Sequence, residues 1–200
     1  MNETKENILK TSLFLFLQKS YKEVTMKEIV DRTGLSKGAF YHYFSSKEEL
    51  FKEIANRFFS MGVVDFTTFN TDSLNSFYTG YVDYLNNNMM RMNAEFLEEQ
   101  NGKASLNFFL IMFEAVNRFP EFLTTELEMH KKELENWKVI ISNARDKGEI
   151  KSDSTDEEIA NLFLYCNDGA FIRFINNDNK TTYKAYLLSA YNTIYNNLKS

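Results

Sequence analysis

The chain has 200 residues, of which 44% are apolar and 16% aromatic, and its net charge is −5. This composition supplies enough apolar surface for a packed core and excludes a disordered chain. The longest apolar runs, Leu13 to Leu17 and Phe108 to Phe113, are far shorter than the roughly 20 residues of a membrane span. No secretory signal is recognised and the chain has a single cysteine, so we expect a protein of the reducing cytoplasm.

Residue types that serve metal binding or catalysis are sparse. The chain has two histidines, and its one cysteine, Cys166, belongs to no Cys-x-x-Cys or comparable ligand spacing. It also lacks a glycine-rich phosphate loop and a serine nucleophile elbow. We therefore expect no metal, no cofactor and no enzymatic activity.

The sequence predicts an all-α fold. One proline and seven glycines are too few for a chain built of strands and hairpins. We expect an amino-terminal helix-turn-helix head of three helices and a carboxy-terminal helical bundle, about nine helices in all, in a dimeric protein. Apolar periodicity places these helices at about 3–19, 26–32, 37–43, 47–66, 74–89, 104–116, 120–147, 156–175 and 181–198.

Helix starts and stops support these ranges. A hydroxyl residue followed three positions later by glutamate is a capping box, and the pairs are Thr25 with Glu28, Ser46 with Glu49 and Thr155 with Glu158. Pro120 suits the first turn of a helix, where a missing N–H has no cost. Gly34 and Gly148 suit helix ends, because glycine adopts positive φ without strain.

Two short helices joined at a tight turn are predicted between Thr25 and Phe44. Small, hydroxylated, cationic and aromatic side chains are crowded on the second of them, which is the chemistry needed to press a helix into the major groove of DNA. The acidic net charge does not oppose this interpretation. Residues 1–57 hold ten Lys and Arg against eight Asp and Glu, a net charge of +2, and the remainder carries −7.

Residues 6–51 resemble the amino-terminal pattern of the TetR/AcrR class of bacterial transcriptional repressors. Beyond residue 60 the resemblance is one of architecture alone, a helical bundle whose last two helices dimerise. The matching positions are Ile8, Phe16, Tyr21, Thr25, Ile29, Gly34, Ser36, Lys37, Gly38, Phe40, Tyr41, Phe44, Ser46, Lys47 and Leu50.

The resemblance implies a DNA-binding domain at residues 1–47 and a ligand-binding and dimerisation domain at residues 48–200. Phe40 and Phe44 are spaced to fill the core of the head. The expected DNA contacts are Thr25, Ser36, Lys37, Gly38, Tyr41, His42, Tyr43 and Lys47. The family's commoner order has an aromatic residue at position 42 and histidine at 43; this chain has the reverse, so the separate roles of His42 and Tyr43 stay open.

A second copy of the chain is the expected partner of the last two helices. The helix at 156–175 has two apolar rows, and one body can cover only one of them. The alternative is that both rows are buried within a single monomer. The expected interface comprises Leu162, Tyr165, Gly169, Ile172, Tyr186, Tyr191 and Ile194.

His130 lies on the apolar stripe of the helix at 120–147. It is either a hydrogen-bonded core histidine or a residue that fixes a polar group of a ligand inside the bundle. Aromatic and methionine side chains suit a pocket for a largely hydrophobic molecule, although they can equally be plain core. The candidate pocket residues are Phe109, Met112, Phe113, His130, Trp137, Phe163 and Cys166.

The sequence therefore predicts a sequence-specific DNA-binding regulator, a homodimeric repressor that a small hydrophobic effector releases from a double-stranded operator. Two alternatives remain open. The chain could be a DNA-binding activator or adaptor that recruits a protein through its acidic body, or a helical small-molecule binding protein that does not bind DNA.

Overall fold

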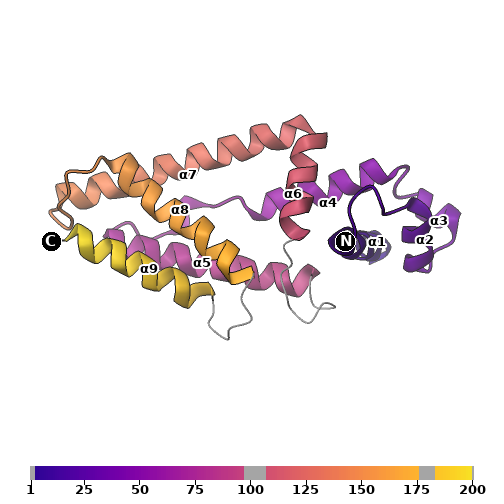
Figure 1. Cartoon of the computed structure of the whole chain (residues 1–200), viewed down its shortest axis with the longest axis horizontal. Helices are drawn as coiled ribbons and strands as arrows, with labels where there is room; N and C mark the ends of the chain where they lie inside the picture. Colours follow the sequence, from indigo (N-terminus) through magenta and orange to yellow (C-terminus); the bar gives the residue numbers. More distant parts are fainter. Residues whose placement is uncertain (1–2, 97–106, 176–182, 200) are drawn as a thin grey trace. The chain divides into compact units, whose positions relative to one another are not determined.

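The computed structural model describes residues 3–96, 107–175 and 183–199, and the secondary structure in these ranges is helical (Figure 1). The predicted all-α fold, with a head of three amino-terminal helices followed by a carboxy-terminal helical bundle, is confirmed. The α-helices are α1 (Glu3–Gln18), α2 (Met26–Thr33), α3 (Lys37–Tyr41), α4 (Lys47–Met61), α5 (Leu74–Phe96), α6 (Asn107–Arg118), α7 (Pro120–Asp146), α8 (Asp156–Ile175) and α9 (Tyr183–Leu198), and a 3-10 helix, η1 (Phe66–Thr68), follows α4. None of the described helices is long and apolar enough to cross a membrane.

The chain forms two compact units. The first unit comprises Met1–Val63 and Met92–Glu126, and the second comprises Val64–Arg91 and Leu127–Ser200. Each unit has its own apolar interior.

Helix α1 organises the first unit, because it packs against α2, α4 and α6. Its apolar residues recur at helical spacing and are buried, among them Ile8, Leu13 and Phe16. The Phe16 ring meets the ring of Phe51 on α4 edge to face, with centroids 5.0 Å apart. This contact fixes α4 against α1, and the short helices α2 and α3 are attached to the same scaffold.

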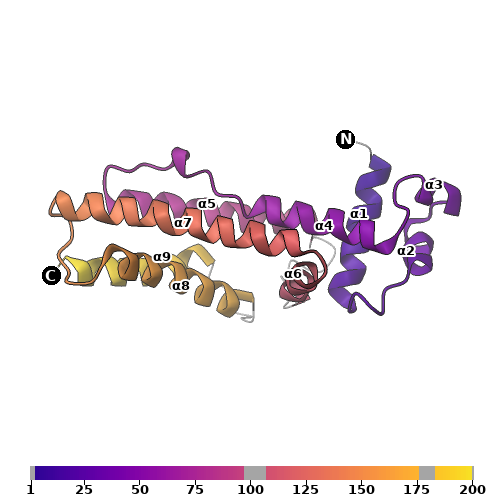
Figure 2. The ribbon, with the colours of Figure 1, turned by 90° about the horizontal axis from the view of Figure 1, so that it is seen from above.

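The second unit is built around Trp137 of α7, which is fully buried. Its indole contacts rings from three other helices: Phe77 and Tyr81 of α5, Phe163 of α8 and Tyr191 of α9. The helices α8 and α9 lie side by side and run in opposite directions (Figures 1 and 2). An aromatic cluster therefore joins all four helices of this unit.

The three predicted hydroxyl caps all begin helices, but only one of the three capping boxes is complete. Thr155 and Glu158 form the full capping box, since each backbone N–H donates to the other side chain. In the other two pairs the glutamate carboxylate has a different partner: Glu28 accepts a hydrogen bond from Lys19, and Glu49 accepts from Ser45. At the starts of α2 and α4, therefore, the hydroxyl accepts the backbone N–H but the glutamate does not return a hydrogen bond to the cap residue.

Helix α4 is shorter than predicted. It ends at Met61, where the N–H of Gly62 donates to the Phe59 carbonyl, and not near Phe66. Apolar residues continue the helical pattern past this point, but the carboxylate of Asp65 accepts from the Thr67 N–H and begins η1. A polar side chain that accepts from a backbone N–H two residues further on thus competes with helix propagation.

The two apolar rows of α8 have different environments. Ile159 and Phe163 of one row are buried, whereas Leu162 and Tyr165 of the other row are 51% and 68% exposed. The alternative in which one monomer buries both rows is therefore wrong. The apolar stripe of α7 is also only partly buried, because Leu123 is exposed while the later members of the stripe enter the core.

Candidate nucleic-acid interface

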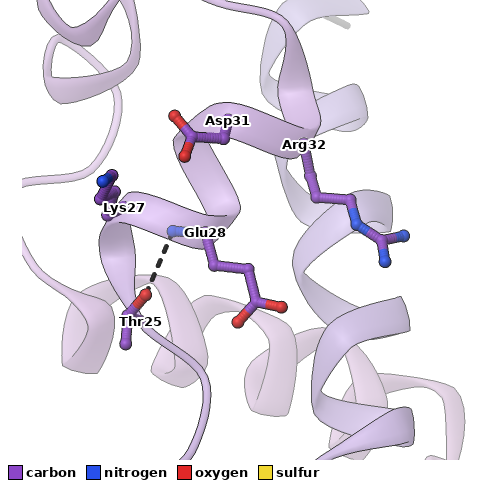
Figure 3. Close-up of a pocket in the computed structure, with 5 residues that line it drawn as sticks. All are labelled: Thr25, Lys27, Glu28, Asp31 and Arg32. Atoms are coloured by element: carbon purple, nitrogen blue, oxygen red, sulfur yellow. Dashed lines mark hydrogen bonds between the residues drawn. The ribbon is translucent and has the colours of Figure 1, made fainter.

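The turn between α2 and α3 is set by two caps and a glycine. The Thr25 hydroxyl accepts the Glu28 N–H at 3.1 Å and begins α2 (Figure 3). Gly34 ends that helix with φ of 69°, a conformation that costs side-chain-bearing residues energy. Two residues later the Ser36 hydroxyl accepts the Ala39 N–H at 3.3 Å and begins α3. The two helices are therefore held at a sharp, defined turn.

Buried aromatic residues attach α3 and the segment after it to the first unit. Phe40 has no exposed surface and Phe44 is 2% exposed, as their spacing predicted. On α2, Ile29 is fully buried and plays the same part. One side of the short helix α3 is thus anchored in the core, and its other side is left at the surface.

Five of the eight predicted DNA contacts lie on α3 or directly after it. Lys37, Gly38, Tyr41 and His42 are exposed, and Tyr43 is half-buried. The Lys37 ammonium lies 5.8 Å from the centre of the Tyr41 ring, so a cation and a phenol are presented together. The exposed residues of α3 and its end form one patch, and the two cap residues, Ser36 of α3 and Thr25 of α2, are exposed as well.

Gly38 lies in this patch, and neither its backbone conformation nor a close contact within the described chain requires a glycine there. A Cβ built on it would meet no atom within 4 Å, and its φ is not among the positive values. Glycine within a helix costs roughly 0.5–1 kcal/mol relative to alanine. The missing side chain therefore leaves room for something outside this chain to approach the backbone of α3.

Lys47 has a different environment from the other predicted contacts. Its ammonium donates at 2.7 Å to the carbonyls of both Tyr21 and Val24, and it lies 4.3 Å from the centre of the Tyr21 ring. Burial lowers the pKa of this amine, and the nearby positive charge of Arg118 lowers it further. Two of its three N–H groups thus hold the segment before α2 to the start of α4.

A shallow depression follows the outer face of α2, and its lining residues come from the cap and the helix (Figure 3). It holds two cations, Lys27 and Arg32, and two carboxylates, Glu28 and Asp31. Lys27 and Arg32 are exposed on the helix that precedes the turn, and sequence reasoning did not select them. Their signal in the sequence was weak, because single cations on a short helix are ordinary surface residues.

The candidate pocket residues fall into the two different units. Phe109, Met112 and Phe113 are on α6 of the first unit, where Phe113 is 64% exposed and lines a cavity of about 420 Å³ beside the end of α1. His130, Trp137, Phe163 and Cys166 are in the second unit. His130 is exposed there and lies near Glu133 and Asp168, two carboxyls that sequence reasoning missed.

The candidate interface residues lie on the surface, with one exception. Leu162, Tyr165, Gly169 and Ile172 are exposed along α8, and Tyr186 and Ile194 of α9 are half-buried. Tyr191 is fully buried, so its assignment to the interface is wrong. Helix α9 is apolar on more than one side, and the side with Tyr191 packs onto Trp137 and Phe163.

Comparison with known proteins places the α1–α4 region in a large group of regulators. Residues 8–54 match the family model described as bacterial regulatory proteins, tetR family. The HTH-type transcriptional regulator YerO of Bacillus subtilis (strain 168) is 44% identical over 63 residues, which are 32% of this chain and 22% of YerO. The TetC protein of transposon Tn10 from Escherichia coli is 30% identical over 91 residues, 42% of this chain and 46% of TetC. The matched segments thus span less than half of these relatives.

Solved structures share the fold over nearly the whole chain. The MbdR regulator from Azoarcus sp. CIB superposes with a TM-score of 0.68 at 18% identity, covering 96% of this chain and 97% of MbdR. The TetR family transcriptional regulator PfmR from Thermus thermophilus gives a TM-score of 0.60 at 22% identity, covering 94% of this chain and 97% of PfmR. The match of residues 8–54 is thus to the tetR family of bacterial regulatory proteins, and over the rest of the chain the likeness to such regulators is one of fold.

Proposed function

We propose that this protein is a sequence-specific DNA-binding transcriptional regulator that works as a homodimer in the cytoplasm. The observation that carries the proposal is the surface of α3, where Lys37, Gly38 and Tyr41 are exposed beside one another while Phe40 anchors the same helix in the core. We assign DNA binding to residues 1–47 and ligand binding and dimerisation to residues 48–200.

In this proposal α3 enters the major groove of the operator. The open space at Gly38 lets the helix backbone approach the DNA closely. Lys37 supplies a cation, and the Tyr41 hydroxyl suits a phosphate oxygen or a base edge. Thr25 and Ser36, together with the backbone at the two helix starts, are candidates for further phosphate contacts.

A second copy of the chain is the partner that we propose for the exposed row of α8. Leu162, Tyr165 and Ile172 are large apolar side chains at helical spacing, and a Cβ on Gly169 between them would meet no atom within 4 Å. Such a row permits close approach of an identical helix. The two copies of α3 must then be ~34 Å apart, one turn of DNA, to enter successive major grooves.

We further propose that a small molecule bound in the second unit releases the repressor from its operator. In one conformation of the dimer the spacing of the two DNA-binding heads does not match successive major grooves. A ligand that prefers this conformation shifts the population away from the DNA-binding form. A differential affinity of ~1.4 kcal/mol reduces operator affinity about tenfold. Both heads must engage together for tight binding, so a small change in their spacing is sufficient.

Selection from a random pool of duplexes tests the DNA-binding proposal. We expect enrichment of an approximately palindromic site whose half-sites are about one helical turn apart. Affinity for that site should also fall steeply between about 50 and 200 mM salt, because phosphate contacts release counterions. Failure to enrich any sequence at low salt would contradict the proposal and favour a small-molecule binding protein without DNA binding.

A further inference from the structure

A cavity of about 420 Å³ lies within the first unit, beside the end of α1, the segment that follows it and one side of α6. Pockets that hold small molecules have volumes of roughly 300–1,000 Å³, so this cavity is large enough for one. Its apolar lining consists of Phe16, Tyr21, Phe51, Leu110, Ile111 and Phe113. All of its described lining belongs to the first unit, so the cavity is separate from the second unit, where the releasing ligand is proposed to bind.

Three aromatic rings that line the cavity contact one another. The centre of the Tyr21 ring is 5.8 Å from that of Phe16 and 4.8 Å from that of Phe51, and the latter two are 5.0 Å apart. Phe16 of α1 and Phe51 of α4 are 4% and 1% exposed, so both are anchored in the core. The aromatic side of the cavity is therefore formed before any ligand arrives.

The α6 side of the cavity is apolar and largely uncovered. Ile111 is buried, whereas Leu110 and Phe113 are 60% and 64% exposed. Leu110 and Phe113 are three positions apart, which places them on the same face of the helix. A molecule that fills the cavity removes these two large side chains from contact with water, and the burial of apolar surface favours binding.

Positive charge beside the aromatic rings disfavours a cationic ligand. The guanidinium carbon of Arg118 lies 3.8 Å from the centre of the Tyr21 ring, and the Lys47 ammonium lies 4.3 Å from it. The ring of Tyr21 thus already binds two cations of the chain itself. Burial raises the pKa of the Tyr21 phenol, so it carries no negative charge at physiological pH that could attract a third.

Carboxylates at the edge of the cavity disfavour an anionic ligand. Glu23 and Glu114 both line it. Lys19, the lining cation in the described part of the chain, is paired with Glu28. Arg118 is paired with Glu114. An anion would therefore meet two like charges, and the neighbouring cations in these pairs are already neutralised.

We propose that this cavity binds an uncharged molecule with an aromatic body. The rings of Phe16, Tyr21 and Phe51 contact one side of the ligand, and Leu110 and Phe113 of α6 cover the other. The site goes beyond the function proposed above and does not depend on it, because binding here is measured on the full chain without DNA.

Three compounds with one skeleton test the proposal by isothermal titration calorimetry. Naphthalene-2-methanol has no charge, naphthalene-2-methanamine is positive and naphthalene-2-carboxylate is negative at neutral pH. We expect the alcohol to bind at least tenfold more tightly than either ion, because the site offers apolar surface and no unpaired charge. Equal binding of the three compounds, or no binding of the alcohol at its solubility limit, would overturn the proposal.

Methyl NMR of protein labelled at isoleucine locates the bound alcohol. Ile111 is the isoleucine of the described cavity lining, and its signal is assigned with the variant Ile111→Val. This signal should shift as the alcohol is added, because the ligand rings lie beside the methyl group. An unshifted Ile111 signal at saturation would overturn the proposal.

A truncation on α6 tests the contact with the ligand. Phe113→Ala removes an exposed ring from the edge of the cavity, so the variant should melt like the original protein while alcohol binding weakens at least tenfold. Leu123→Ala, at an exposed apolar position of α7 in the same unit, is the matched control and should not change binding. Unchanged alcohol affinity in Phe113→Ala would refute the assignment.

A charge placed at the edge of the cavity gives a second, independent decision. Leu110→Glu changes a side chain that is 60% exposed, so the fold does not depend on it. The added carboxylate should weaken alcohol binding and strengthen amine binding, and the tenfold advantage of the alcohol should disappear. Leu110→Gln has the same shape without the charge and should leave amine binding unchanged. An alcohol advantage that survives in Leu110→Glu would contradict the proposal.

Discussion

Lys47 is the residue whose observed surroundings differ most from its predicted ones. The TetR/AcrR resemblance assigned it to the DNA backbone, and the structure directs two of its N–H groups to the carbonyls of Tyr21 and Val24. No sequence pattern could reveal this, because the two acceptors are backbone atoms 26 and 23 residues away. Because Lys47 forms only these two hydrogen bonds among the described residues, a DNA contact by its third N–H stays a prediction.

Replacing Lys47 with methionine tests the structural role. The variant leaves two half-buried carbonyls without their donor, so the free energy of unfolding should fall by about 1–3 kcal/mol. Lys10→Met, which removes the same charge from an exposed position of α1, should change stability by less than about 0.5 kcal/mol. Urea denaturation of both variants measures the effect, and equal stabilities would contradict the role of Lys47 as a clamp.

The ion pair between Glu6 and Arg57 predicts a dependence of stability on pH. The two terminal guanidinium nitrogens, Nη1 and Nη2, donate to the carboxylate at 2.6 Å, and these bonds hold the pKa of Glu6 below its ordinary value of 4.5. A lowered folded-state pKa stabilises the protein above the unfolded-state pKa, and the contribution is lost as pH falls through the folded-state value.

Glu6→Gln should therefore destabilise the protein by about 1 kcal/mol at pH 7, and the difference should shrink as pH falls below about 4.5. Denaturation of the original protein and the variant at about pH 7, 5 and 3 measures the change. Glu53→Gln breaks a more exposed pair with Lys5 and serves as the control. A difference that is the same at all three pH values would contradict this account.

At the scale of elements, helix α3 is short and is stabilised by its cap and by the burial of Phe40. Gly38 lies on its exposed side with open space around it, whereas Gly148 ends α7 with φ of 70°. Gly38→Ala should raise stability by about 0.5–1 kcal/mol and weaken operator binding, because the added methyl group occupies the space that DNA needs.

Gly148→Ala is the opposite case and the matched control. Its positive φ strains any residue with a Cβ, so stability should fall by about 1 kcal/mol while the affinity of the folded protein for DNA stays unchanged. Thermal unfolding and fluorescence anisotropy measure the two properties for both variants. A Gly38→Ala protein that binds the operator as well as the original would argue against close approach of α3 to DNA.

Local sequence signals predicted the helix ends correctly where the contact that sets the end joins residues close together in the sequence. Gly34, Gly148 and the hydroxyl caps act within a few residues, so sequence reasoning found these helix ends. The end of α4 was missed because Asp65, within a run of apolar residues, accepts a hydrogen bond from the Thr67 N–H and begins a new element. The burial of Tyr191 was missed because α9 is apolar on two sides, and only packing against Trp137 decides between them.

The candidate site was predictable in the head and much less so in the body. Phe40, Phe44 and the exposed patch on α3 follow a pattern of spacing that sequence alone contains. The cavity at the end of α1 is lined from α1, α4 and α6, which are far apart in sequence, and no local pattern joins them. Their association depends on tertiary packing, which is why sequence reasoning selected only Phe113 from its lining.

For the whole molecule, the proposed dimer makes DNA affinity depend on a surface far from α3 in sequence. Leu162→Asp with Tyr165→Asp should leave the monomer folded, because both side chains are exposed in the single chain. Sedimentation should then show a monomer, and operator affinity should fall by at least about 100-fold, since one head alone binds its half-site. Val139→Asp, at an exposed position of α7, is the control. A dimer that survives the double change would place the interface elsewhere.

The most direct test of the account is operator binding by a protein without its two central contacts, measured by fluorescence anisotropy at fixed salt. Lys37→Ala with Tyr41→Ala should weaken binding to the selected operator by at least about thirtyfold while the dimer and the melting temperature are preserved. Lys131→Ala, which removes one charge from an exposed position of α7, should bind like the original protein. Unchanged operator affinity in the double variant would contradict the assignment of α3 as the DNA-reading helix.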